Sequence, residues 1–252
     1  MISMRKIIPI VLFAVFIITA VTCSKKTVRL ALSEQDSYTK VSGLYEKGKY
    51  VRFLDDSKYF LSDYPASKHA AKVQYWTGEA YTYRKEYEEA IFAYQRVIDK
   101  YSDSEYLDDA YYKIGEVYFK QKLNPQRDQT ATKKAIYYYE KVAQLGSPFT
   151  DDARVKIRHC RSLLAQKQYY IARFYYRSKQ YDTSIALLDE ALSNFSDTPE
   201  MAYFYYLKGM NYFKQKDTEK TRAMLAMMEQ YKPLDEKLAK YVAKLEKKLL
   251  EK

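Results

Sequence analysis

One spacing constrains the fold of this 252-residue chain more than any other feature. A small or short side chain recurs at nearly regular intervals, and a large one follows it three residues later. The recurring positions are Val41, Gly78, Gly115, Ala172 and Gly209, and they are 37, 37, 57 and 37 residues apart. The large residues that follow are Leu44, Tyr81, Tyr118, Tyr175 and Tyr212. A period in the range of roughly 20–50 residues predicts an array of repeated units stacked in one direction.

The pattern matches the tetratricopeptide repeat, a pair of helices with a period of about 34 residues. The small residue allows the second helix to approach the first, and the large residue fills the space beside it. The small residue expected in the second helix is present as Ala90, Ala135 and Ser184. Six glycines and six prolines are too few for a many-stranded β fold. The sequence therefore predicts an all-α tetratricopeptide-repeat (TPR) helical solenoid with five repeats.

Two further segments depart from the regular spacing. Residues 123–128, Leu-Asn-Pro-Gln-Arg-Asp, predict a loop inside the third repeat, because proline, asparagine and aspartate interrupt helices. The first helix of the fourth repeat is predicted to extend back to about Asp151. After the fifth repeat, residues 234–252 form a charged segment with a helical apolar stripe, which suits a helix that caps the stack. The stripe consists of Leu238, Val242, Leu245 and Leu249.

The N-terminus carries the signature of export. Arg5 and Lys6 precede an apolar run from 7 to 20, which predicts a signal peptide over residues 1–22. Ala20-Val21-Thr22-Cys23 is similar to the processing site of bacterial lipoproteins, so we expect Cys23 to carry a covalent lipid and residues 23–35 to form a polar leader. Cleavage after Ala20 without lipid, a membrane-spanning anchor, and a disulfide between Cys23 and Cys160 are the alternatives.

The composition argues against catalysis and against nucleic acid. The net charge of +11 arises from lysines and arginines interleaved with 32 acidic residues, rather than from a basic arm. The two histidines, His69 and His159, have no metal-ligand spacing, and His159 and Cys160 are adjacent and so point to different sides of a helix. We therefore expect a protein-binding chain, with no enzyme activity, metal, small-molecule substrate or nucleic acid partner. The only cofactor-like group expected is the lipid on Cys23.

An aromatic stripe runs through the first helix of every repeat. Its members at the fifth repeat position are Tyr38, Tyr75, Tyr112, Tyr169 and Tyr206. Its aromatic members at the twelfth position are Tyr45, Phe119, Tyr176 and Phe213. Residues i, i+4 and i+7 share one face of a helix, so these side chains and the ninth-position residues between them lie together. They are predicted either to line a groove for a peptide or to pack the first helix against the neighbouring repeat.

Several segments of the fourth repeat resemble one known family. They are 147–153 (Ser-Pro-Phe-Thr-Asp-Asp-Ala), Leu164-Ala165, 171–176 (Ile-Ala-Arg-Phe-Tyr-Tyr) and 195–198 (Phe-Ser-Asp-Thr). They resemble the BamD family of TPR lipoproteins from the outer-membrane β-barrel assembly machine. The lipoprotein leader, the five repeats, the interrupted third repeat and the long fourth-repeat helix agree with it. The chain departs from the family at Ser102 and Ser196, where proline is usual, and at Leu187, where a basic residue is usual.

The resemblance implies a function and a division of the chain. Residues 36–149 would form the substrate-binding half, which receives unfolded β-barrel proteins through their C-terminal strands. Residues 150–252 would form the docking half, which binds the periplasmic domains of the barrel insertase. The chain would then be lipid-anchored at the periplasmic face of the outer membrane. The alternatives are a periplasmic TPR adaptor of the Tol-Pal type, which coordinates peptidoglycan machinery, and an accessory subunit of a secretion system.

Overall fold

The computed structural model describes residues 32–251, and their regular structure is entirely helical. The first six helices are α2 (Glu34–Glu46), α3 (Tyr50–Asp63), α4 (Ala70–Tyr83), α5 (Tyr87–Lys100), α6 (Leu107–Lys120) and α7 (Thr130–Leu145). The remaining helices are α8 (Thr150–Arg177), α9 (Tyr181–Asn194), α10 (Met201–Lys214), α11 (Thr218–Met227), the short 3-10 helix η2 (Glu229–Tyr231) and α12 (Glu236–Leu250).

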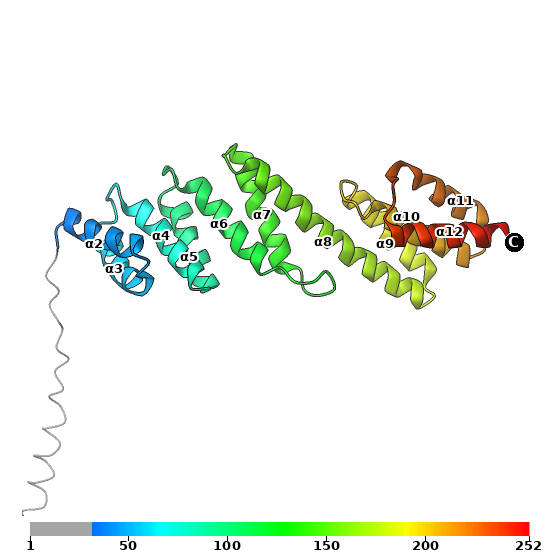
Figure 1. The fold of residues 1–252 in the computed structure, drawn as a ribbon, viewed down its shortest axis with the longest axis horizontal. Helices are drawn as coiled ribbons and strands as arrows, with labels where there is room; N and C mark the ends of the chain where they lie inside the picture. The colour runs from blue at the N-terminus through cyan, green and yellow to red at the C-terminus, as the bar shows by residue number, and fades with distance from the viewer. Residues whose placement is uncertain (1–31, 252) are drawn as a thin grey trace, which may run out of the picture.

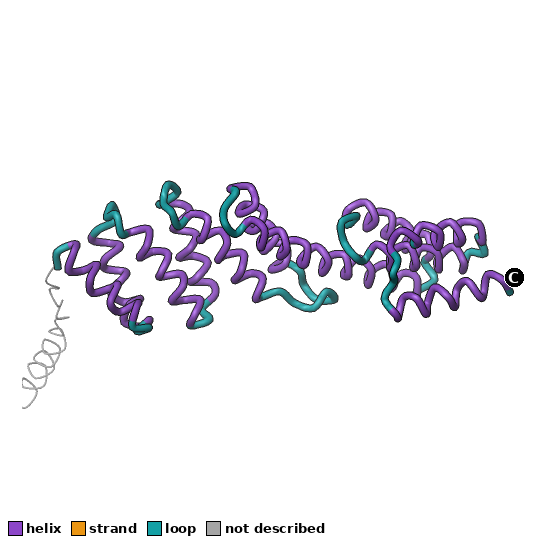
Figure 2. Tube along the Cα trace, turned by 45° about the horizontal axis from the view of Figure 1, so that its top comes forward, coloured by secondary structure: helices purple, strands orange, loops and turns teal. Residues whose placement is uncertain are grey.

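Consecutive helices form five antiparallel pairs that stack side by side into an elongated array (Figure 1). The pairs are α2/α3, α4/α5, α6/α7, α8/α9 and α10/α11, so each corresponds to one repeat of the sequence pattern. The helix α12 packs beside α10 at the C-terminal end of the stack (Figure 2). The side chains of Leu238, Leu245 and Leu249 are buried. The predicted TPR solenoid of five repeats with a capping helix is confirmed.

In the second and third repeats, the recurring small residue is required by an aromatic ring of the second helix. A Cβ atom placed on Gly78 would lie 2.5 Å from Cε1 of Tyr94, and one placed on Gly115 would lie 2.8 Å from Cε1 of Tyr139. Both tyrosines are fully buried. Real Cβ atoms do not approach other carbons this closely, so only glycine permits the two helices of these repeats to pack around the ring.

The turns between paired helices share a left-handed residue. The φ angles are 65° at Gly48, 63° at Lys85, 61° at Lys179 and 65° at Lys216. Glycine adopts this conformation without steric cost, whereas a lysine does not. Three of the four simple hairpin turns in the described chain therefore place a lysine in a conformation that disfavours it.

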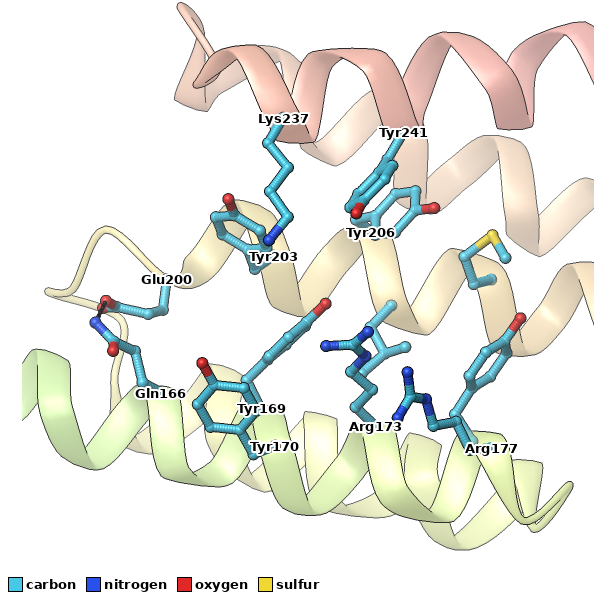
Figure 3. Close-up of a pocket in the computed structure, with 13 residues that line it drawn as sticks. Gln166, Tyr169, Tyr170, Arg173, Arg177, Glu200, Tyr203, Tyr206, Lys237 and Tyr241 are labelled. Carbon is cyan, nitrogen blue, oxygen red and sulfur yellow. Dashed lines mark hydrogen bonds between the residues drawn. The ribbon is translucent and has the colours of Figure 1, made fainter. Parts of the chain in front are cut away.

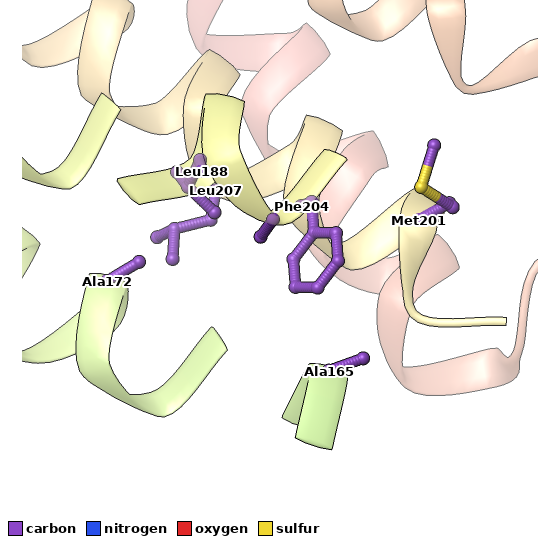
Figure 4. Packing of buried hydrophobic residues seen from close by; sticks show 7 residues of the cluster. Ala165, Ala172, Leu188, Met201, Phe204 and Leu207 are labelled. Carbon is purple, nitrogen blue, oxygen red and sulfur yellow. The ribbon is translucent and has the colours of Figure 1, made fainter. Parts of the chain in front are cut away.

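Each junction between neighbouring repeats has its own apolar cluster. Between the fourth and fifth repeats, Ala165 and Ala172 of α8 contact Leu188 of α9 and Phe204 and Leu207 of α10 (Figure 4). The alanines allow close approach of the helices, and the larger side chains fill the space between them. The stack is consequently held by a series of local cores rather than by one central core.

The interruption of the third repeat is a loop that links α6 to α7. The side chain of Gln129 is buried beneath it and donates hydrogen bonds to the carbonyls of Asn124 and Arg127, at 3.0 and 3.3 Å. Lys167 of α8 donates to the same Arg127 carbonyl from the next repeat, at 3.0 Å. The predicted loop and the backward extension of α8 are both observed, and the loop is secured at each end.

The predictions for the extreme N-terminus lie outside the described residues. They comprise the signal peptide over 1–22, lipid attachment at Cys23 and most of the leader over 23–35. Cys160 is described, and its side chain is fully buried with Ala135, Tyr139 and Val142 in the cluster between the third and fourth repeats. Burial raises the pKa of its thiol to about 11.

Candidate functional site

The aromatic stripe is divided between core and surface. Tyr75 is 7% exposed and packs against Tyr94 and Tyr106, so it belongs to the core between repeats. The other predicted residues are half-buried, so each contributes to packing and also presents part of its ring to solvent. They are Tyr38, Tyr45, Tyr112, Phe119, Tyr169, Tyr176, Tyr206 and Phe213.

In the first three repeats, the stripe residues pack mainly on neighbouring side chains. The ring of Tyr45 stacks on Trp76 of the second repeat with centroids 4.4 Å apart. The ring of Phe119 lies edge-on to Tyr139 and His159. These contacts extend the repeat junctions to the surface, so the stripe residues of these repeats both pack on their neighbours and present part of their rings to solvent.

Carboxylates at the ninth repeat position are fully partnered in this part of the chain. The Glu79 carboxylate accepts from the Tyr45 hydroxyl at 2.5 Å and forms an ion pair with Lys113 of the third repeat at 2.9 Å. The Glu116 carboxylate likewise accepts from the Tyr139 hydroxyl at 2.5 Å and pairs with Lys156 of α8 at 2.7 Å. Each lysine is thus neutralised by the preceding repeat.

The same face is different in the last two repeats. A cavity of about 420 Å³ lies between α8, α10 and α12 (Figure 3). Helices α8 and α10 contribute four members of the predicted stripe, and the cavity brings together three of them, Tyr169, Tyr176 and Tyr206, whereas Phe213 does not line it. The tyrosines that line it are Tyr169, Tyr170, Tyr176, Tyr203, Tyr206 and Tyr241. Burial raises the pKa of the Tyr206 hydroxyl to about 12, so it is protonated at neutral pH and available as a donor.

Three cations line this cavity, and the carboxylate of Glu200, which also lines it, is bonded to Ser162 and Gln166 instead. Arg173 and Arg177 extend from α8 and Lys237 extends from α12 (Figure 3). None of the three forms an ion pair with any residue between 32 and 251. The positive charge raises the electrostatic potential inside a recess whose walls are mostly tyrosine.

Sequence reasoning missed half of this cavity. Tyr170, Arg177 and Lys237 have no place in the repeat pattern, and Tyr241 lies on the capping helix, whose apolar stripe was interpreted only as a seal for the stack. At the ninth repeat position, the fourth repeat has Arg173, whereas the second and third repeats have glutamate. This change from a negative to a positive side chain was the sequence feature that could have indicated a distinct site in the last two repeats.

The aromatic face and the cationic cavity can be set against known proteins. Residues 31–199 match the family model of YfiO, described as an outer membrane lipoprotein. The match covers more than half of the chain. The chain belongs to this family.

A curated relative and several solved structures are also similar. The outer membrane protein assembly factor BamD of Caulobacter vibrioides is 26% identical over 171 residues, which cover 66% of the present chain and 56% of that relative. Among solved structures, the TPR2AB domain of yeast Sti1 has a TM-score of 0.42 at 16% identity, covering 79% of this chain and 78% of that one. The TPR protein TTC0263 of Thermus thermophilus has a TM-score of 0.35 at 18% identity, covering 84% and 98%.

Membership of this YfiO/BamD family makes the chain a non-enzymatic adaptor among outer-membrane lipoproteins. Within residues 32–251, no helix combines the length and the apolar character that crossing a bilayer requires.

Proposed function

We propose that the chain is an assembly factor for outer-membrane β-barrel proteins, anchored at the periplasmic face of the outer membrane by a lipid on Cys23. The family match over residues 31–199, together with the similarity to a BamD, is the observation that carries this proposal. Residues 36–149 would bind unfolded barrel proteins, and residues 150–252 would bind the periplasmic domains of the insertase.

The different surfaces of the two halves support such a division. The first three repeats present an aromatic face whose charges are neutralised within the protein, through Glu79 with Lys113 and Glu116 with Lys156. That face suits the apolar and aromatic side chains of an unfolded barrel strand. The last two repeats present a cationic cavity, which suits a partner with complementary charge.

Site-specific photocrosslinking would test the assignment of the two halves. A photoreactive residue at Ser42, at the ninth position of the first repeat, should capture nascent barrel proteins. One at Met210, which lines the C-terminal cavity, should capture the insertase. Glu89, exposed on the second helix of its repeat, provides a control. Capture of peptidoglycan synthases at both positions, without barrel proteins or insertase, would favour the Tol-Pal type of adaptor instead.

Lipid attachment has a separate test. Metabolic labelling with palmitate should mark the natural protein and not the Cys23→Ser variant, which should also leave the membrane fraction. A mature N-terminus at Val21 would contradict the proposal, because Cys23 could not then be the acylated first residue.

A further inference from the structure

We infer that the cavity between α8, α10 and α12 binds an acidic peptide segment of a partner protein, with a carboxylate side chain held by Arg173 and Arg177 and a neighbouring aromatic side chain against the tyrosines. This inference deepens the proposed function, on which it rests for the partner being a protein of the assembly machinery. The charge, the walls and one buried carboxylate of the cavity each restrict the occupant.

The charge restricts the occupant to an anion. On the same face of the preceding repeats, Lys113 and Lys156 are each bound by a glutamate. Arg173, Arg177 and Lys237 line the cavity and have no such partner in the described part of the chain. Arg173 is half-buried, whereas Arg177 and Lys237 are exposed. A guanidinium binds a carboxylate through two parallel hydrogen bonds, and two guanidinium groups one helical turn apart on α8 can enclose one.

The aromatic walls of the cavity restrict the occupant to an anionic group that has an apolar side chain next to it. Tyr169 and Tyr203 lie edge to face with centroids 5.6 Å apart, and Tyr206 stacks on Tyr241 of the capping helix at 5.9 Å (Figure 3). A cavity of about 420 Å³ accommodates a few side chains and not a folded domain. A short extended segment that carries an aromatic residue beside its carboxylate matches both the size and the lining.

Glu200 disfavours a doubly charged phosphate as the occupant of the cavity. This residue is 7% exposed and lines the cavity, and its Oε1 accepts a hydrogen bond from Gln166 at 2.9 Å (Figure 3). The hydroxyl of Ser162 donates to the same oxygen at 2.5 Å. Its Oε2 atom is buried and has no donor among the described residues. A phosphate with two negative charges would be repelled by this carboxylate more strongly than a side-chain carboxylate with one.

The chain's own leader is unsuited to the cavity. Residues 24–31 carry Lys25, Lys26 and Arg29 and no acidic residue, so their charge has the same sign as the arginines. The occupant is consequently supplied by another protein.

Fluorescence anisotropy of labelled peptides on the detergent-extracted mature protein would test the inference. The probe is the peptide Ser-Phe-Glu-Phe-Ser, acetylated and amidated to remove the terminal charges, and its matched control has Gln in place of Glu. We expect the glutamate peptide to bind at least tenfold more tightly. In the double variant Arg173→Gln/Arg177→Gln this preference should disappear, whereas Arg158→Gln/Arg222→Gln, which removes two exposed arginines, should retain it. Thermal melting of both variants verifies that they fold.

Three results would contradict the inference that this cavity binds an acidic peptide. They are equal binding of the two peptides, a preference that survives the loss of both cavity arginines, and arginine-dependent binding of phosphatidylglycerol vesicles without binding of the peptide. The titration contains no assembly partner, so its failure would reject the cavity and leave the crosslinking result from Ser42 standing. Conversely, peptide binding with no capture of insertase or barrel proteins would retain the site and reject the assembly role.

Discussion

The hydroxyl of Tyr45 in the first repeat donates a hydrogen bond to the carboxylate of Glu79 in the second, across 2.5 Å. Burial, reinforced by Glu79, raises the pKa of this tyrosine, so the hydroxyl is protonated and can act as the donor. Lys113 of the third repeat contacts the other oxygen of the same carboxylate. One glutamate therefore connects three successive repeats along the face of their first helices.

A double-mutant cycle on this pair should show coupling. Tyr45→Phe removes the hydroxyl and retains the ring stack on Trp76, and Glu79→Gln removes the charge. Because the carboxylate is partly solvated, we expect a coupling energy of about 0.5–1.5 kcal/mol in the free energy of unfolding. Urea unfolding followed by fluorescence of Trp76, the chain's one tryptophan, measures it directly. Additive effects of the two substitutions would show that the hydrogen bond contributes nothing to stability.

Substitution of two helical glycines by alanine should have opposite effects. At Gly78, the new methyl group would meet the Tyr94 ring at 2.5 Å, so Gly78→Ala should cost about 1–3 kcal/mol. At Gly43, nothing lies within 4 Å of the added carbon, and alanine is the better helix former, so Gly43→Ala should stabilise by up to about 1 kcal/mol. Thermal melting of the two variants beside the parent protein compares them. A loss of stability in both variants would mean that backbone effects and not the tyrosine ring dominate.

Replacement of a turn lysine by glycine should stabilise the protein. Lys179 has a φ angle of 61°, where its Cβ is crowded by the backbone. Lys179→Gly should therefore raise the free energy of unfolding by about 0.5–1 kcal/mol, after the entropic cost of glycine is included. The matched change Lys133→Gly, at an exposed position within α7, should lower it by a similar amount. The measurement is the urea concentration at the midpoint of unfolding for each variant and for the parent protein. If both midpoints shifted in the same direction, the steric explanation would be wrong.

Stability should decrease as the pH falls below about 6.5 because of His69. Its imidazole stacks on Tyr38 with centroids 3.6 Å apart, and burial, with Lys68 adding to it, lowers the pKa of His69 from the reference value of 6.5. Glu34 opposes this shift and Lys72 adds to it. A histidine with a lowered folded-state pKa binds fewer protons in the folded state than in the unfolded state. Its contribution to the free energy of unfolding is therefore fully present above pH 6.5 and is lost as the pH falls through the folded-state pKa.

The control for this pH dependence is His69→Phe, which retains an aromatic ring against Tyr38 and does not titrate. Melting temperatures measured from pH 7.5 to pH 5 should fall more steeply for the parent protein than for the variant. Identical slopes would exclude His69 as the titrating group.

The repeat architecture could be predicted from sequence because it depends on short-range features. The small residue at Gly78, the proline-containing loop over 123–128 and the helix extended to Asp151 each follow from residue type and spacing. The ring of Tyr94, which requires the glycine, was shown only by the structure. Such a solenoid is assembled from contacts between adjacent repeats, so a local pattern is sufficient to define it.

The candidate site could be predicted only in part. The helical period placed Tyr169 and Tyr206 on one face, but it could not show that Tyr241 of the capping helix lies against Tyr206. Nor could it separate the buried Tyr75 from its half-buried equivalents, because burial depends on which side chain the next repeat supplies, here Tyr106. The charges of Arg173 and Arg177 gained significance only when the structure placed no carboxylate of residues 32–251 beside them.

The helix α8 belongs to both halves of the protein. Its N-terminal part contributes Ala153 and Cys160 to the cluster with the third repeat, and its C-terminal part contributes Ala165 and Ala172 to the cluster with the fifth. Each residue of an α-helix advances the chain by about 1.5 Å and turns it by about 100°. Insertion of a single residue in the middle of α8 would therefore rotate the last two repeats by more than a quarter turn while leaving every local core intact. The number of residues in α8 therefore sets the angle, about the axis of that helix, between a partner bound at the C-terminal cavity and a partner bound on the N-terminal face.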